Sequence, residues 1–120
     1  WELDSDRPIY AQIVDRLKHE IVSGFYPPGS RLPSVRDLAA QASVNPNTMQ
    51  KAFTELERTG LIVTRRTSGR MVTEDTALIE QVRSELAELQ ISQFLTRMQH
   101  LGYQKDDSIR LLLAKKEEIS

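Results

Sequence analysis

Hydrophobic residues recur at helical spacing in two neighbouring segments of the first half of the chain. In each segment four apolar residues follow the i, i+3, i+4, i+7 pattern of an amphipathic helix. The first set is Val35, Leu38, Ala39 and Ala42, and the second is Met49, Ala52, Phe53 and Leu56. The pattern predicts two short helices that pack on a common core. Because only residues 43–45 separate them, the pair has the turn length of a helix-turn-helix.

The residues that begin these two helices agree with this interpretation. Ser34 stands three residues before Asp37, a spacing that resembles a capping box. Asn45 precedes Pro46, which places a good N-cap before a proline at the first helical position. In a helix-turn-helix, the N-terminal end of the second helix faces the DNA major groove. The segment therefore predicts double-stranded DNA as a partner.

The elements on either side complete a winged helix. An apolar stripe from Pro8 to about Ser23 predicts a helix before the pair. After the pair, β-branched residues at 61–65, a turn at 66–69 and an extended pattern at 70–73 predict a hairpin in the place of a wing. Four aromatic residues fit the apolar patterns and are expected in the core, not as stacking platforms for single strands. They are Tyr10, Phe25, Tyr26 and Phe53.

The C-terminal part of the chain carries a longer helical stripe. It predicts a helix of roughly 25 residues that shifts phase near Ile91 and ends at Gly102, followed by a second helix from residues 106–107. Two such helices need another apolar surface, either their own winged-helix domain or a second chain. The length of the stripe favours the second chain, and we predict a two-fold homodimer through residues 74–118. The expected dimerisation residues are Ile79, Val82, Leu86, Leu89, Phe94, Leu95, Met98, Leu101, Ile109, Leu112 and Leu113.

These patterns together predict a mainly α-helical protein with a small β-hairpin. Residues 1–73 are expected to form a winged helix-turn-helix DNA-binding domain, and residues 74–120 a two-helix dimerisation tail.

Composition removes several classes of function. The 120 residues contain no cysteine, which excludes disulfide, thiol and zinc-finger chemistry. The two histidines, His19 and His100, lie far apart in the sequence, so we expect neither a metal nor a cofactor. No apolar run approaches the roughly 20 residues of a membrane span, so the expected protein is cytoplasmic and has no membrane partner.

Charge is distributed unevenly along the chain. The formal net charge is −1. Residues 7–72 carry ten Lys/Arg and five Asp/Glu, whereas residues 73–120 carry six and nine. A mildly basic module joined to an acidic one fits a DNA-binding domain with a different kind of tail, and the alternative is chance asymmetry in a small protein.

A long ordered run precedes and covers the first helix of the pair. Residues 28–39 read Pro-Gly-Ser-Arg-Leu-Pro-Ser-Val-Arg-Asp-Leu-Ala. This run resembles the PG-x-x-LPS-x-R-x-LA signature of GntR-type bacterial transcription regulators, and residues 45–62 resemble the recognition helix and its exit. The Asn-Pro-Asn-Thr start at residues 45–48 and the short tail point to the YtrA-like subfamily. The resemblance implies a winged-helix regulator that belongs to an operon encoding an ABC transporter.

The wing tip departs from the family pattern. The family commonly reads Arg-Arg-Gly-x-Gly there, whereas residues 65–69 read Arg-Arg-Thr-Ser-Gly. Thr67 replaces the first glycine, and threonine lacks the backbone freedom of glycine. We expect the tip to be stiffer or differently turned.

Candidate base-reading residues lie at the N-terminal end of the second helix of the pair. With the apolar face buried, Asn47 and Lys51 face outward, flanked by Thr48 and Gln50. Asn and Gln bond adenine through two hydrogen bonds, and Lys reaches guanine acceptors or a phosphate. The alternative is that all four are solvated helix residues.

Arginines supply the other candidate contacts. The resemblance implies that Arg36 reads a guanine in each half-site, and the alternative is an ion pair with Asp37 or a plain surface charge. Wing arginines clamp phosphate or enter the minor groove, unless they are solvated charges that protect an edge strand. For Ser34, capping its own helix is the expected main role. The full set of expected DNA contacts is Arg31, Ser34, Arg36, Asn45, Asn47, Thr48, Gln50, Lys51, Arg65, Arg66, Ser68, Gly69 and Arg70.

The sequence therefore favours a dimeric DNA-binding transcription regulator, expected to be a repressor on a palindromic operator. The alternative is a winged helix that serves as a protein-interaction or scaffold module. An enzyme is disfavoured, because no nucleophile–base pair, phosphate loop or carboxylate pair is recognisable. The tail offers no obvious pocket for a small-molecule effector. Such a ligand would bind between the tail helices at the dimer seam, or the protein responds only to its own concentration.

Overall fold

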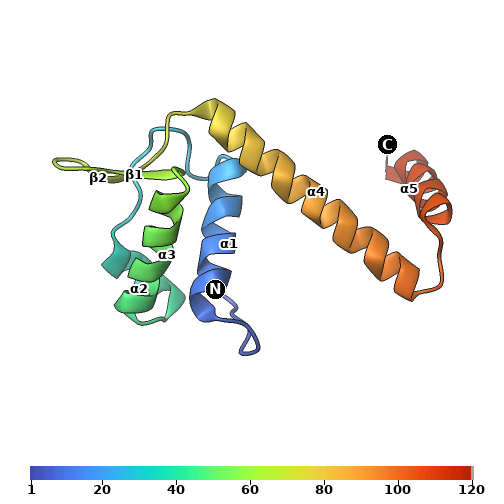
Figure 1. Ribbon diagram of the computed structural model, residues 1–120, viewed down its shortest axis with the longest axis horizontal. Coiled ribbons are helices and arrows are strands. Elements are labelled where there is room, and N and C mark those ends of the chain that lie inside the picture. Colours follow the sequence, from blue (N-terminus) through green and yellow to red (C-terminus); the bar gives the residue numbers. More distant parts are fainter. Residues whose placement is uncertain (120) are drawn as a thin grey trace. The chain divides into compact units, whose positions relative to one another are not determined.

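The computed structural model describes residues 1–119. Within them, five helices and one two-stranded antiparallel hairpin follow one another along the chain (Figure 1). The elements are α1 (Ile9–Val22), α2 (Val35–Ala42), α3 (Pro46–Arg58), β1 (Ile62–Arg65), β2 (Gly69–Val72), α4 (Thr76–His100) and α5 (Lys105–Ile119). This order confirms the predicted mainly helical fold, a winged helix-turn-helix followed by two C-terminal helices.

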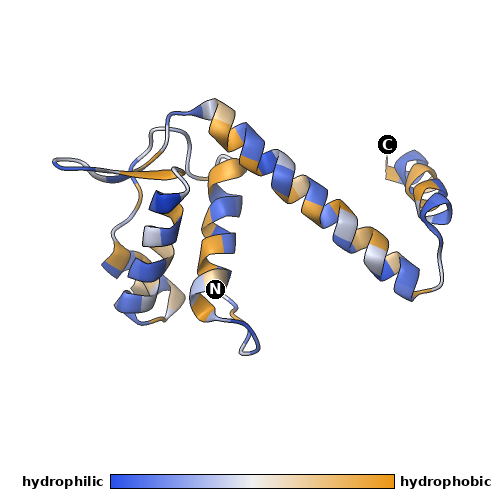
Figure 2. Ribbon diagram, in the orientation of Figure 1, coloured by the Kyte–Doolittle hydropathy of each residue, from blue (hydrophilic) through white to orange (hydrophobic). Residues whose placement is uncertain are grey.

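The core of the winged-helix part is built around α3. Its residues Met49, Ala52, Phe53 and Leu56 are fully buried. The helix packs against α1, α2 and β1, and hydrophobic segments recur along α1 and α3 in Figure 2. Other core residues are Ile13, Val14, Leu17, Ile21, Val22, Leu32, Leu38, Ala39, Ala42, Leu61, Ile62 and Val72. The buried face of α3 is the one that the helical spacing predicts. On α2, the predicted Leu38, Ala39 and Ala42 are buried, whereas Val35 is half-buried.

Both predicted caps form at the starts of α2 and α3. The Ser34 hydroxyl oxygen accepts a hydrogen bond from the backbone N–H of Asp37 at 3.0 Å. The Asn45 side-chain oxygen accepts one from the backbone N–H of Asn47 at 2.8 Å. Ser43 ends α2 in the left-handed region, with φ 56°. The chain therefore turns within the three residues between the helices, and this turn determines how α3 lies against α2.

The segment before α2 pairs with β2 as a short third strand-like segment beside the hairpin. In the hairpin, Ile62 lies opposite Val72 and Arg65 opposite Gly69. On the other side of β2, Arg31 forms a β-bridge with Met71. Hydrogen bonds from the Leu32 N–H to the Arg70 carbonyl and from the Val72 N–H to the Ser30 carbonyl, each 2.9 Å, flank this bridge. Main-chain hydrogen bonds thus fasten the wing, defined here as residues 62–72, to the entrance of the helix-turn-helix.

The prediction that Phe25 lies in the core is wrong, because its side chain is 68% exposed. Gly24 turns the chain sharply with φ 88°. The Tyr26 N–H then donates to the Glu20 carbonyl at 3.1 Å, which brings Tyr26 rather than Phe25 toward the protein. The Phe25 ring makes an edge-to-face contact with the Tyr26 ring, with 4.9 Å between the two centroids. Partial burial of Tyr26 raises the pKa of its phenol.

The described chain divides into two structural units within α4. The first unit ends at Arg83 and the second begins at Ser84, whereas the predicted boundary between the DNA-binding domain and the tail is at residue 73. The first turns of α4 belong to the winged-helix unit because Ile79 is only 4% exposed. In addition, the Arg83 Nε donates to the Val22 carbonyl at 3.1 Å. Ile79, a predicted dimerisation residue, is thus buried within a single chain.

The second unit leaves much of its apolar surface uncovered. Successive residues turn by about 100° in a helix, so the phase shift near Ile91 places the apolar residues before and after it on different sides of α4. Hydrophobic and hydrophilic bands alternate along α4 in Figure 2. The exposed large apolar residues of this unit are Leu89, Ile91, Leu101, Tyr103, Ile109, Leu111, Leu112, Leu113 and Ile119. Val82, Leu86, Phe94, Leu95 and Met98 are half-buried. None of the helices in residues 1–119 combines the length and apolar character needed to cross a lipid bilayer.

A substitution at Gly60 should test how closely α4 approaches the end of α3. Gly60 has φ 87°, and an added Cβ would lie 3.3 Å from the Leu78 side chain. We expect Gly60→Ala to lower the free energy of unfolding by roughly 1–3 kcal/mol, because both backbone strain and crowding oppose it. The measurement is thermal unfolding followed by circular dichroism at fixed protein concentration.

Gly24→Ala is the matched control for this prediction. Gly24 has nearly the same φ of 88° and belongs to the same unit, but an added Cβ there meets nothing within 4 Å. Its substitution should therefore cost only the backbone strain. Equal losses in the two variants would show that the Leu78 contact does not matter.

Candidate nucleic-acid interface

The exposed side of α3 carries the predicted base-reading residues. Because four positions of α3 are fully buried, helical geometry directs Asn47 and Lys51 to the opposite side. Asn47, Gln50 and Lys51 are exposed, and Thr48 is half-buried. Asn45 is exposed as well, with its side-chain oxygen engaged in the cap of α3. The N-terminal end of α3 thus presents amides and an ammonium group, the groups that hydrogen-bond base edges.

Lys51 lies next to α1. Its Nζ is 4.0 Å from the centroid of the Tyr10 ring. A cation–π contact of this kind at an exposed site contributes about 0.5–1 kcal/mol. Tyr10 therefore sets where the Lys51 ammonium stands before any ligand arrives. The sequence pattern places Tyr10 in the core, and the structure shows it half-buried with its ring beneath this lysine.

Arg36 is exposed on α2. One alternative for this residue is an ion pair with Asp37, and no such pair occurs among the ion pairs of residues 1–119. Asp37 therefore does not occupy the Arg36 guanidinium, which can hydrogen-bond to another group. A solvent-facing guanidinium on the first helix of a helix-turn-helix is suited to a guanine edge or a phosphate.

A recess between the wing and the start of α2 brings several predicted residues together. It has a volume of about 410 Å³ and is lined in part by Arg31, Ser34, Gly69 and Arg70. An added Cβ on Gly69 would lie 3.7 Å from the Arg31 Nε, so Arg31 lies close to the wing tip. Ser34 has its hydroxyl committed to the α2 cap, as the sequence predicts.

The wing arginines differ from one another in their surroundings. Arg65 and Arg66 are exposed, and Ser68 beside them is half-buried. Arg70, in contrast, points back to α3: its Nε donates to the Glu57 carboxylate at 2.6 Å. One of its terminal nitrogens donates to the Gln50 side-chain oxygen at 3.4 Å.

Glu57 is a residue that sequence reasoning missed. It lies on α3, flanks the buried face and is 32% exposed at its side chain in the pair with Arg70. The two partners are thirteen positions apart in the sequence, and neither helical nor strand periodicity relates positions so distant. The signal that the sequence offers is a carboxylate on the second helix of the pair together with a basic residue on the hairpin that follows it.

Another arginine of α3 is also paired. The guanidinium of Arg58 hydrogen-bonds to Glu55 one turn earlier. This hydrogen bond lowers the pKa of Glu55 and raises that of Arg58. Both side chains are solvent-exposed, so the pair contributes little to stability. It holds the Arg58 charge at the C-terminal end of α3, away from the predicted base-reading residues at the other end.

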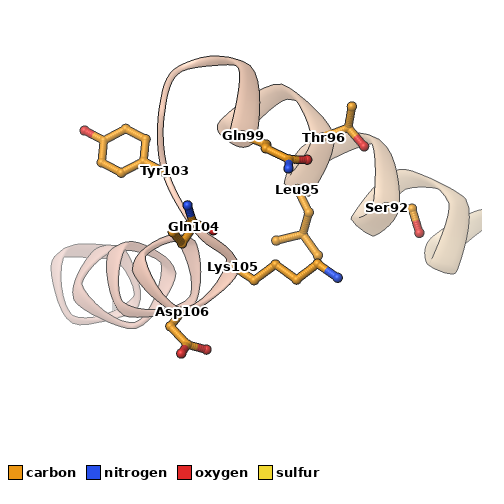
Figure 3. A pocket seen from close by; sticks show the side chains of 8 residues that line it. All are labelled: Ser92, Leu95, Thr96, Gln99, Tyr103, Gln104, Lys105 and Asp106. Carbon is orange, nitrogen blue, oxygen red and sulfur yellow. The ribbon is translucent and has the colours of Figure 1, made fainter.

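The tail contains a recess that the sequence pattern does not predict. The end of α4, the turn after it and the start of α5 enclose about 490 Å³ (Figure 3). The chain reverses direction there within a few residues, which brings polar side chains from both helices to one place. The lining residues are Ser92, Leu95, Thr96, Gln99, Tyr103, Gln104, Lys105 and Asp106. In residues 1–119, no cluster of three or more His, Asp or Glu side chains is arranged to hold a metal ion.

Comparisons with known proteins agree with this geometry. The model of the gntR family of bacterial regulatory proteins matches residues 9–72. The chain is 35% identical over 108 residues to the transcriptional regulator YhcF of Bacillus subtilis, which covers 90% of this chain and 89% of YhcF. It is 40% identical over 100 residues to the transcriptional repressor YtrA of the same organism, covering 82% of this chain and 76% of YtrA.

A solved structure extends the likeness to the tail. A GntR-family transcriptional regulator from Listeria monocytogenes superposes with a TM-score of 0.84 at 41% sequence identity. The match covers 93% of this chain and 98% of that one, so it includes the C-terminal helices. The chain therefore belongs to the gntR family of bacterial regulatory proteins, a family of DNA-binding transcriptional regulators rather than enzymes.

Proposed function

We propose that the protein is a cytoplasmic transcriptional repressor that binds a palindromic operator as a homodimer. In this proposal, α3 enters the major groove with its N-terminal end first, and the wing lies along the neighbouring backbone. Asn47, Gln50 and Lys51 read bases, Arg36 contacts a guanine, and the exposed wing arginines neutralise phosphates.

The observation that carries the proposal is the state of the basic side chains on the helix-turn-helix and wing. Arg36, Arg65 and Arg66 are exposed. None of the ion pairs within residues 1–119 involves them. Three exposed guanidinium groups without an acidic partner give this small unit positive charges that repel one another. Binding of DNA, a polyanion, would neutralise these charges and would account for the exposed arginines on this unit.

Repression is the direction of control that we propose. A dimer that occupies promoter DNA through its winged-helix units blocks access to that DNA. The name of the Bacillus subtilis relative YtrA, a transcriptional repressor, supports this direction of control. Control of an ABC transporter operon is what the resemblance to the YtrA-like subfamily implies, and the polar recess of the tail is a place for an effector.

The tail supports the homodimer. Ile109, Leu112 and Leu113 of α5 are 50–59% exposed in the single chain, as is Leu89 of α4 at 53%. Clustered apolar surface of this kind marks a protein contact. Two half-sites bound together add their contact energies, which turns weak binding by one wing domain into specific binding.

DNA binding should be selective and strongly dependent on salt. We expect a palindromic duplex to emerge from selection on random DNA, with affinity falling on the order of 10³-fold between about 50 and 200 mM salt. Arg36→Ala should relax the base preference at one position in each half-site and cost on the order of 1–3 kcal/mol of binding free energy. Repeating the selection with the variant, and titrating both proteins by fluorescence anisotropy, measures the two effects.

Arg7→Ala is the control for this prediction, because it removes an equal charge from an exposed arginine that is paired with Asp15 near the N-terminus. Its base preference should equal that of the parent. A flat salt response would favour the alternative, a protein-interaction module. An unchanged base preference in Arg36→Ala would show that Arg36 does not contact a base.

The tail should hold the dimer together through its apolar face. Leu86→Glu combined with Leu89→Glu places two carboxylates on the apolar side of the first half of α4, and we expect a monomer by light scattering. The control is Ser84→Glu with Ala87→Glu, two exposed positions with the same spacing on the other side. It should remain dimeric, and an unchanged mass in the leucine variant would place the pairing elsewhere.

A further inference from the structure

Arg70 connects the wing to the recognition helix. Its guanidinium makes three contacts with α3: the Nε donates to the Glu57 carboxylate at 2.6 Å, a terminal nitrogen donates to the Gln50 side-chain oxygen at 3.4 Å, and the Cζ lies 5.3 Å from the centre of the Phe53 ring. We call this arrangement of Arg70, Glu57 and Gln50 the wing–helix contact.

The side chains of the wing–helix contact are less exposed to solvent than those of most ion pairs in residues 1–119. The Arg70 and Glu57 side chains are 27% and 32% exposed, whereas those of Arg58 and Glu55 on the same helix are 70% and 38% exposed. A partly desolvated, charge-assisted hydrogen bond is stronger than an exposed one. The Phe53 ring beneath the guanidinium is fully buried, so the contact is anchored on the core.

The Gln50 amide is held from both ends. Its oxygen accepts from Arg70, and its nitrogen donates to the Thr54 hydroxyl at 3.3 Å. That hydroxyl in turn donates to the Gln50 backbone carbonyl at 3.0 Å. The surrounding groups therefore determine which end of the amide faces which way. Bidentate bonding to adenine requires a defined amide orientation.

We infer that Arg70 and Glu57 are positioning residues for base recognition: they dock the wing on α3 and aim the Gln50 amide. This inference rests on the proposed DNA-binding function. It replaces the view of Arg70 as a phosphate clamp. Base preference at the position that faces Gln50 then depends on a carboxylate that touches no DNA.

Glu57→Gln tests whether Glu57 has a positioning role, because operator affinity should change in opposite directions with and without that role. Without a positioning role, removing a negative charge from the DNA-facing unit should tighten binding to every duplex. With the positioning role, the neutral amide holds Arg70 less firmly, so affinity for the selected operator should fall about tenfold, the size of a lost base contact. Affinity for random duplex should stay level or rise, because the freed arginine can reach phosphate.

Arg70→Lys provides the second variant. It keeps the charge but loses the planar fork that contacts Glu57 and Gln50 together. The inference predicts the same loss of discrimination as in Glu57→Gln, with an unchanged dependence of affinity on salt. Parental discrimination in Arg70→Lys would overturn it.

Glu55→Gln is the matched control. It removes the same charge from the same helix, two residues away, where the partner is the exposed Arg58. Its ratio of operator to random affinity should equal that of the parent. Amide hydrogen exchange without DNA supplies an independent measurement: residues 64–69 of the wing should exchange faster in Glu57→Gln than in Glu55→Gln. Thermal unfolding by circular dichroism establishes that each variant is folded.

The outcomes separate this inference from the function on which it rests. If the parent protein selects no sequence from random DNA, both fail. If the parent selects an operator and Glu57→Gln binds it as tightly and as selectively, or exchanges its wing amides no faster than Glu55→Gln, only the positioning role fails. A parallel loss in Glu57→Gln and Arg70→Lys, with Glu55→Gln unchanged, supports it.

Discussion

Burial of one face of α3 is the constraint on which the rest of the winged-helix unit depends. Met49, Ala52, Phe53 and Leu56 are fully buried among α1, α2 and β1. Replacing a buried Phe with Ala costs about 3–5 kcal/mol, a large part of the stability of a small domain. Because that face cannot rotate without losing this burial, the opposite face cannot rotate either. The placement of Asn47 and Lys51 on the exposed side of α3 is therefore a consequence of packing on the other side of the same helix.

Most of the fold could be predicted because its signals are local. The i, i+3, i+4, i+7 spacing identifies the buried faces of α2 and α3, and the Ser34 and Asn45 caps mark where these helices begin. Each of these signals involves residues within two turns of one another, where backbone geometry alone relates them. The same reasoning identifies the outer face of α3, since a helix with a known inner face has a known outer one. Each of these signals describes a single helix or strand. None of them indicates which side chains of different elements contact one another.

The side-chain pairs that sequence reasoning missed are contacts between different elements. Nothing in the periodicity relates Arg70 to Glu57, or Lys51 to Tyr10, because each pair joins two elements whose relative placement arises only on folding. The sequence shows that an arginine lies on a hairpin, but it does not show whether the side chain contacts phosphate, solvent or a carboxylate. Phe25 shows the converse error: its apolar character suggests burial, yet the turn at Gly24 directs its neighbour inward instead. Long-range pairing and local turn geometry thus decide the roles of individual side chains within a predictable fold.

The tail extends this argument to assembly. A long helix that pairs with its copy along one seam keeps its apolar residues on a single stripe, as in a coiled coil with a seven-residue repeat. The phase shift near Ile91 interrupts that stripe, so the apolar positions before it and after it face different directions. One flat seam cannot cover both. A symmetric dimer pairs each surface with its counterpart on the other chain, and α5, whose Ile109, Leu112 and Leu113 are 50–59% exposed, supplies the additional apolar surface that a second direction requires. The proposed dimer therefore needs both tail helices, which accounts for an α5 that has little apolar contact of its own within the chain.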